Sequence, residues 1–144
     1  MHGMHVVKTW SATQATVALS SGEAEYAADV KAASILLGFK SLLADLGIEP
    51  ARCELYTDSS AALGVANRTG LGKLRHLAVH LLWLQEKVRS SEICMHKVPG
   101  SHNPADVLTK HVPQDTMHKH MHALCLSFAS GRAASAPQAL IESH

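Results

Sequence analysis

The sequence predicts an α/β domain, in which a mixed sheet is flanked by helices. Short runs rich in β-branched residues alternate along the chain with longer runs whose apolar residues recur at helical spacing. Hydrophobic residues make up 47% of the 144 residues, which is enough for a packed core and too many for a disordered chain. The resulting order of strand, helix, strand, helix, helix, strand and helix over residues 4–110 is typical of α/β proteins.

The first half of the chain predicts one extended segment and one long helix. Met4–Ser11 is rich in Val and Thr, which favours a strand. The SSGE run at residues 20–23 is a capping box, and it predicts a helix over residues 22–46 that ends at Gly47. Because Ala32–Leu43 is apolar almost all round, we expect this helix to be buried against a sheet.

The second half of the chain predicts short strands alternating with helices, followed by a small, polar tail. Gly, Pro and Asn separate these segments and mark the turns between them. The predicted elements are strands at Cys53–Asp58 and Glu92–Val98, helices at Ser59–Arg68, Leu74–Arg89, Ala105–Lys110 and Gln114–Phe128, and a disordered tail at residues 129–144.

The composition excludes several classes of protein. The 13 Lys and Arg residues balance 12 Asp and Glu residues, which excludes a polybasic arm or an acidic tail as the main feature. No apolar run reaches the ~18 residues of a membrane span, so we expect no membrane partner. The first residues lack the long apolar stretch of a signal peptide, so we expect an intracellular protein. Three widely spaced Cys residues without a CxxC pair argue against a disulfide scaffold. An aromatic content of 4% argues against modules that stack single-stranded bases.

Three carboxylates occupy positions where a ligand site is expected. Glu25 lies in the first turn of the long predicted helix, Asp58 ends a predicted strand, and Asp106 follows a Pro-Gly loop at the start of a helix. If the two strands are neighbours, these carboxylates converge at one edge of the sheet. Clustered carboxylates repel one another unless a cation neutralises them, and oxygen ligands suit Mg²⁺ or Mn²⁺. Such a cluster would support two-metal hydrolysis of a phosphodiester.

Each of these carboxylates also has a purely structural interpretation. Glu25 would favour a helix N-terminus through the helix dipole, and Asp106 would do the same as a first-turn acid. Asp58 would serve as the N-cap of the helix that follows it. The spacing of the residues leaves both interpretations open.

Four motifs add a more specific signal. They are TVALSSGEAEY at residues 16–26, LYTDSSAAL at 55–63, RHL at 75–77 and KVPGSHNPADVLTK at 97–110. In this order and spacing they resemble the ribonuclease H domain at the end of copia-type LTR retrotransposon Pol polyproteins, over about residues 3–113. The resemblance implies a ribonuclease H-like fold and hydrolysis of the RNA strand of RNA–DNA hybrids. It also implies two Mg²⁺ ions held by four acidic residues, of which Glu25, Asp58 and Asp106 match catalytic, metal-binding positions.

The sequence departs from the family pattern at its beginning. The family's domain starts with a strand that carries the first catalytic Asp and continues with a second strand, whereas this sequence matches from the turn before the third strand. We therefore expect a partial domain at residues 1–113, a C-terminal helix at 114–128 and the tail beyond it. Losing a principal metal ligand costs orders of magnitude in rate, so we expect little or no nuclease activity from this chain alone. The missing strand would expose the backbone of Cys53–Asp58 and favour self-association.

Basic residues gather in the second half of the chain, where they could follow the phosphates of a hybrid. Arg68, Lys73 and Arg75 lie on or beside a Gly-rich loop and are the first candidates for nucleic-acid contacts. A solvated surface of mixed charge explains them equally well. A hybrid would be recognised by its shape and its 2′-hydroxyl groups, so we expect little base specificity.

The 11 histidines are an unusual excess. His102 lies four residues before Asp106, where an imidazole could carry protons near neutral pH. His76 and His80 are four residues apart in a predicted helix, as are His118 and His122, and Cys125 lies one turn beyond the second pair. This spacing is compatible with a zinc site, although solvated helix faces explain it more simply.

Two classes of function therefore remain open. The chain is either a ribonuclease H domain that works beside the upstream reverse transcriptase region of a polyprotein, or a non-catalytic remnant that binds nucleic acid weakly or acts as an interaction module. Translation of the genomic DNA upstream of Met1 distinguishes them. An in-frame pair of strands with an early Asp favours the enzyme, and stop codons favour the remnant.

Overall fold

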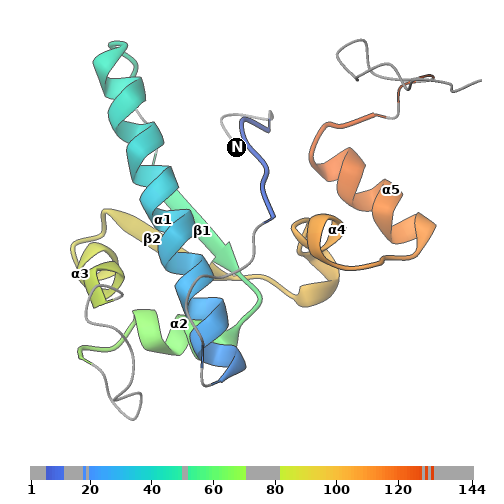
Figure 1. The fold of residues 1–144 in the computed structure, drawn as a ribbon. Coiled ribbons are helices and arrows are strands. Elements are labelled where there is room, and N and C mark those ends of the chain that lie inside the picture. Colours follow the sequence, from blue (N-terminus) through green and yellow to red (C-terminus); the bar gives the residue numbers. More distant parts are fainter. Residues whose placement is uncertain are drawn as a thin grey trace, which may run out of the picture.

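The computed structural model describes residues 6–11, 18, 20–49, 52–70, 82–127, 129 and 131. These residues form a mixed α/β structure with a two-stranded sheet (Figure 1). The elements are α1 (Ser21–Asp45), β1 (Cys53–Thr57), α2 (Ser60–Ala66), α3 (Trp83–Arg89), β2 (Ile93–Lys97), a 3₁₀ turn (Gly100–His102), α4 (Asp106–Thr109) and α5 (Gln114–Ala123).

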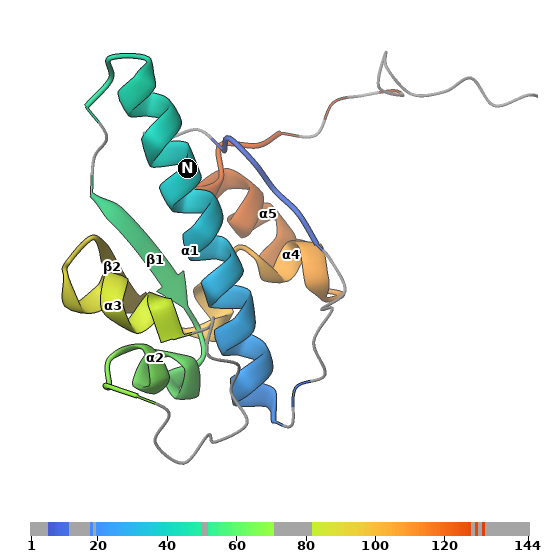
Figure 2. The same ribbon diagram turned by 60° about the vertical axis from the view of Figure 1, so that its left-hand side comes forward.

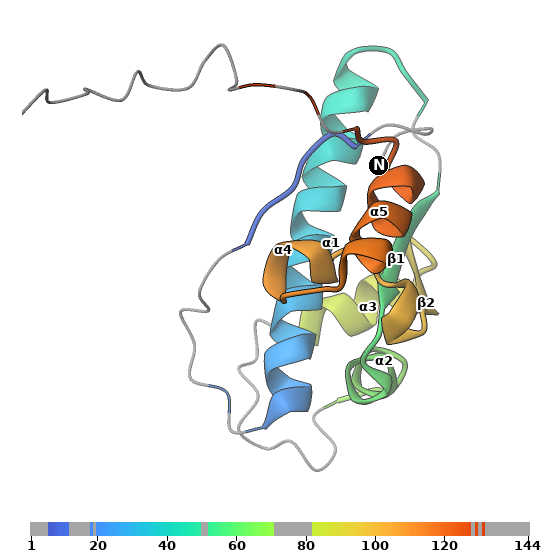
Figure 3. The same ribbon diagram turned by 90° about the vertical axis from the view of Figure 1, so that its right-hand side faces the viewer.

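The sheet consists of β1 and β2 in parallel, with Cys53 opposite Ile93 and Thr57 opposite Lys97. A parallel pair needs a long crossover connection, which here includes α2 and α3. In Figures 1 and 2, α2 and α3 lie on one side of α1, and α4 and α5 lie on the other. Figure 3 shows α1 running beside the sheet. The carboxyl end of β1 therefore lies between helices that are far apart in the sequence.

Local capping determines where α1 begins and ends, as the sequence predicts. The Ser20 hydroxyl accepts a hydrogen bond from the backbone N–H of Glu23 at 3.2 Å. At the other end, Gly47 adopts a φ of 73°, and the Ile48 N–H donates to the Leu43 carbonyl at 2.9 Å. This is the left-handed helix ending for which glycine has no steric penalty.

The core lies between α1, the sheet and the two crossover helices. Its buried apolar residues are Tyr26, Val30, Ala33, Cys53, Ala62, Val65, Ala66, Leu84 and Ile93. The side chains of β1 alternate between buried and exposed positions, as expected for a strand covered on one face.

A buried polar side chain joins the two crossover helices. The Gln85 amide donates to the Val65 carbonyl at 2.9 Å and to the Gly70 carbonyl at 3.0 Å. Its oxygen accepts from the Gly70 N–H at 2.9 Å. Gln85 therefore satisfies backbone groups that would otherwise lie unpaired between α2 and α3.

The second half of α1 is less buried than the sequence predicts. Leu42 is 49% exposed and Leu46 is 66% exposed, although Ala33 in the first half is fully buried. A 25-residue helix extends over about 37 Å, whereas a five-residue strand extends over only about 17 Å. The helix is therefore longer than the described strands that it packs against. The burial expected along Ala32–Leu43 holds for Ala33 and in part for Leu36 and Leu37, and it is wrong for Leu42.

Three other predicted elements also differ from the structure. Residues 6–11 are not a strand, because the described sheet offers them no pairing partner, and Trp10 is 40% exposed. The last helix ends at Ala123 instead of Phe128, because Cys125 adopts a left-handed φ of 54° that stops the helix. The predicted helix Leu74–Arg89 is confirmed only over α3, since residues 71–81 lie outside the described residues.

Across the described ranges, none of the helices is both long enough and apolar enough to cross a membrane.

Candidate functional site

Asp58 follows the last residue of β1 and has no capping role. Its neighbour Ser59 caps α2 instead, because the Ser59 hydroxyl accepts from the Ala62 N–H at 3.1 Å. The interpretation of Asp58 as an N-cap is therefore wrong. The ammonium group of Lys97, at the end of β2, donates to the Asp58 backbone carbonyl. The backbone of Asp58 is thus held at the carboxyl end of the sheet, and its carboxylate does not cap the following helix.

The loop after β2 approaches Asp58 closely. A side-chain carbon added at Gly100 would lie 3.7 Å from Oδ2 of Asp58. His102 is exposed in the same 3₁₀ turn, and its Nδ1 lies 3.1 Å from the Ser101 hydroxyl. The structure therefore brings the loop that carries His102 next to Asp58, as the sequence predicts.

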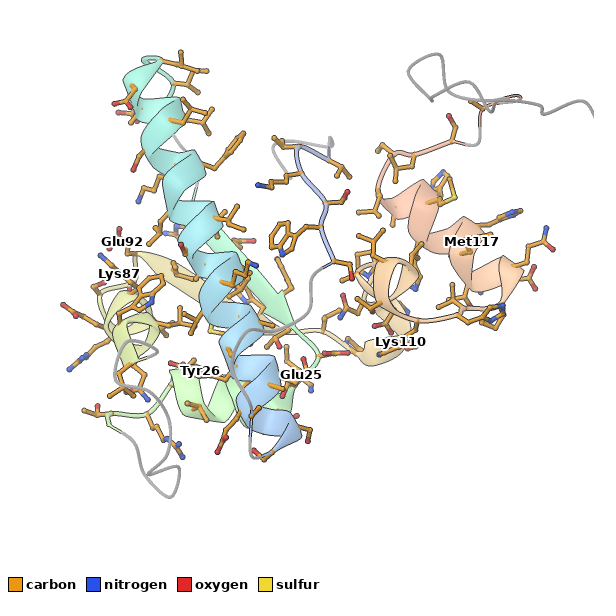
Figure 4. The ribbon with its side chains drawn as sticks, in the orientation of Figure 1. Glu25, Tyr26, Lys87, Glu92, Lys110 and Met117 are labelled. Atoms are coloured by element: carbon orange, nitrogen blue, oxygen red, sulfur yellow. The ribbon has the colours of Figure 1, made fainter. Side chains whose placement is uncertain are left out.

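Glu25 lies in the second turn of α1, one turn later than expected, and its side chain is exposed. Figure 4 shows Glu25 on the side of α1 that is nearer to Lys110, whereas Tyr26 lies on the other side. The acid in the first turn is Glu23, so the helix dipole does not explain Glu25. Its position instead agrees with a role at the end of β1.

Lys110 links the three predicted carboxylates. Its ammonium group donates to the Asp106 carboxylate at 2.9 Å, one helical turn away. This hydrogen bond and the charge of Asp106 raise the pKa of Lys110, and the charges of Asp58 and Glu25 raise it further. Electrostatic forces between exposed groups are screened over about 8 Å in physiological salt. Asp106 is therefore paired with Lys110, and Glu25 and Asp58, from two other segments of the chain, lie within electrostatic reach of the same lysine.

Asp29 is a fourth carboxylate that sequence reasoning missed. It lies on the buried face of α1, one turn after Glu25, and only 9% of it is exposed. Burial raises its pKa to about 7, the Thr57 hydroxyl lowers the pKa through a hydrogen bond, and the charges of Glu25 and Asp58 raise it. Its Oδ2 is buried without a hydrogen-bond partner. An acidic residue three positions after Tyr26, on the helical stripe that continues with Val30 and Ala33, was the signal that could have found it.

The four carboxylates fit a hard divalent cation in their donor chemistry but are not arranged around one. Carboxylate oxygens are the ligands that Mg²⁺ and Mn²⁺ prefer, and the orphaned oxygen of Asp29 lacks the partner that a buried carboxylate needs. Among the residues that the structure describes, however, no three His, Cys, Asp or Glu side chains are placed to hold a metal ion. An ion would therefore have to displace Lys110 from Asp106 and draw the carboxylates closer together.

The zinc hypothesis receives no support from the described residues. His118, His122 and Cys125 are not brought together as ligands. His76 and His80, the other pair at helical spacing, lie outside the described residues.

The predicted nucleic-acid residues are described only in part. Arg68 lines a small pocket of about 180 Å³ together with Gln85 and Arg89. Its charge lowers the pKa of Tyr26, whose net pKa is nevertheless raised to about 12, chiefly by burial. Arg68 thus acts on the core as well as on the surface. Lys73 and Arg75 lie outside the described residues.

Comparison with known proteins shows that the sequence is similar to part of a retroelement polyprotein. The chain is similar to the retrovirus-related Pol polyprotein from transposon TNT 1-94 of Nicotiana tabacum, with 33% identity over 106 residues. The similarity supports a retrotransposon Pol-derived protein. The match spans 73% of this chain but 8% of the Nicotiana polyprotein, so the chain corresponds to a small part of that protein. No family model matches the chain, and no solved structure matches it significantly.

Proposed function

We propose that this chain is a ribonuclease H-like domain of a copia-type retrotransposon Pol polyprotein. Its substrate would be the RNA strand of RNA–DNA hybrids, which the domain would hydrolyse with Mg²⁺, or with Mn²⁺ in its place. The observation that carries the proposal is that Glu25, Asp58 and Asp106, the three residues that the family motifs single out, all act on Lys110, Asp106 through an ion pair and the other two through their charges. The two-stranded parallel sheet with flanking helices is compatible with that fold.

The side chains of this chain would have distinct tasks in that reaction. Glu25, Asp58 and Asp106 would hold the cation, which in such sites activates a water molecule and stabilises the leaving oxygen. Lys97 fixes the backbone of Asp58, and Lys110 keeps the charge of Asp106 balanced until substrate and cation arrive. His102, exposed in the neighbouring turn, is the candidate proton carrier.

The activity of this chain by itself is expected to be low. The family pattern contains four acidic metal ligands, and its first Asp has no counterpart in the motifs that this sequence matches. We therefore expect little or no turnover of a labelled RNA–DNA hybrid in Mg²⁺. Robust cleavage that is abolished by Asp58→Asn would show that the remaining carboxylates are sufficient.

Substrate binding tests the proposed function independently of turnover. We expect fluorescence anisotropy to detect tighter binding of an RNA–DNA hybrid than of a DNA duplex of the same sequence. Mg²⁺ should strengthen hybrid binding, and Asp58→Asn should remove this effect. Asp45→Asn, an exposed carboxylate at the far end of α1, is the matched control and should retain it. Equal affinity for both duplexes, with no effect of Mg²⁺, would contradict the proposal.

A second candidate function is a non-catalytic nucleic-acid-binding module of retroelement origin. The lack of a ready-made three-ligand metal set among the described residues favours it. This alternative predicts hybrid binding that is weakened by salt but unchanged by Mg²⁺ or by Asp58→Asn.

A further inference from the structure

Asp29 lies at the inner end of the carboxylate group. It follows Glu25 by one helical turn, and its hydrogen-bonding neighbour Thr57 is the residue directly before Asp58. The Thr57 hydroxyl oxygen also lies 3.3 Å from the backbone N–H of Ser59, which donates to it. Through the Thr57 hydroxyl, Asp29 is therefore linked to the two residues that flank Asp58 in the β1–α2 turn.

The free oxygen of Asp29 is what distinguishes it from an ordinary buried acid. Its Oδ2 is buried and accepts no hydrogen bond, and the residue as a whole is only 9% exposed. Leaving such an oxygen unpaired is unfavourable because its hydration is lost without replacement, and two like charges nearby add to that penalty. The charges of both Glu25 and Asp58 act on Asp29. A cation shared with these two carboxylates would remove both penalties.

An approach path for a cation is also present. Glu25 is exposed and Asp58 is partly exposed, whereas Asp29 is buried. A cation arriving from solvent would therefore meet Glu25 and Asp58 first and Asp29 last. Lys110, the nearby positive charge, is itself exposed and paired with Asp106, so it does not reach the orphaned oxygen as an ion-pair partner.

We propose that Asp29 is an additional carboxylate ligand for a divalent cation bound between Glu25 and Asp58. This inference rests on the proposed metal-dependent function and adds a residue that the family motifs do not single out. Asp29 would supply a carboxylate to a site for which the matched motifs provide only three. Because the described side chains are not yet in coordinating positions, cation binding would rotate them toward one another.

Mn²⁺ binding by the full chain tests the proposal directly. Isothermal titration should give an affinity that falls by at least about tenfold in Asp29→Asn, as expected for a metal-site substitution. Asp45→Asn removes the same charge from the same helix and should leave the affinity unchanged within about twofold. Unchanged Mn²⁺ affinity in Asp29→Asn, with binding lost in Asp58→Asn, would overturn the role of Asp29 and leave the proposed function standing. A wild-type chain that binds no Mn²⁺ would overturn both.

A ligand exchange separates coordination from a structural effect. Asp29→Cys should weaken Mn²⁺ binding and strengthen Cd²⁺ binding, because a thiolate prefers the softer ion. Asp45→Cys, measured in parallel, accounts for Cd²⁺ bound by the native Cys and His side chains. An equal Cd²⁺ affinity in the two cysteine variants would overturn direct coordination by residue 29, even if Asp29→Asn proved unable to fold.

Discussion

The buried carboxyl of Asp29 makes the stability of this protein depend on pH in an unusual direction. The pKa of Asp29 is raised from 3.8 to about 7, chiefly by burial. Between pH 4 and pH 7 the folded chain therefore holds a proton that the unfolded chain releases, so this group's contribution to stability falls as pH rises. A difference of about three pH units corresponds to roughly 4 kcal/mol lost by pH 8, at about 1.4 kcal/mol for each unit.

Asp29→Asn keeps the shape of the side chain and removes its charge. In EDTA, the free energy of unfolding should therefore exceed that of the wild type by about 2–4 kcal/mol at pH 8, but by less than about 1 kcal/mol at pH 4. Urea unfolding followed by circular dichroism measures the free energy of unfolding of both proteins at each pH. The contributions of groups that titrate alike in the two proteins cancel when one value is subtracted from the other. Asp45→Asn serves as the exposed control. A difference that does not change with pH, or an Asn variant that is less stable at pH 8, would refute the reasoning.

Three further predictions concern charge, buried polarity and backbone. Lys110→Gln releases Asp106 and should raise Mn²⁺ affinity in calorimetry by roughly two- to fivefold, as for an exposed ion pair; an unchanged or lower affinity would contradict it. Gln85→Ala should lower the free energy of unfolding in urea by about 3 kcal/mol, because buried backbone groups lose three hydrogen bonds; a loss below 1 kcal/mol would contradict it. Gly38→Ala should raise the free energy of unfolding by up to about 1 kcal/mol, because alanine favours a helix and the site has room for it. Gly47→Ala should lower it by about 1 kcal/mol, because the φ of 73° at this position favours glycine. Equal melting temperatures of the two variants would refute this contrast.

The local features of the fold could be predicted because they depend on near neighbours in the chain. Ser20 caps α1 and Gly47 ends it, since each acts on backbone groups within one turn. Strands Cys53–Thr57 and Ile93–Lys97 lie within one residue of their predicted bounds. The prediction of a strand at residues 6–11 was wrong for the opposite reason. A strand is stabilised by pairing with a neighbouring strand, and residue propensity does not show whether such a neighbour is present.

The residues of the candidate site likewise fall into those that the sequence predicted and those that it did not. The motifs identified Glu25, Asp58 and Asp106, since residue type and order are properties of the sequence. They did not identify Asp29, whose importance depends on burial against β1 and on the hydroxyl of Thr57. Nor did they identify Lys110, which pairs with Asp106 and feels the charges of Glu25 and Asp58.

The sequence alone thus determined most of the secondary structure, the retroelement motifs and the identity of three carboxylates. The cap of α2 at Ser59 and the pair between Asp106 and Lys110 are also local, since each joins residues within one helical turn. Only the tertiary structure decided that the end of α1 remains exposed and that the loop with Gly100 lies beside Asp58. It also decided which carboxylate is buried with a free oxygen. The physical reason is that hydrogen bonds within a helix turn are encoded over a few residues. Burial and charge, in contrast, depend on which distant segments pack together, and here α1, the sheet and the two crossover helices do so.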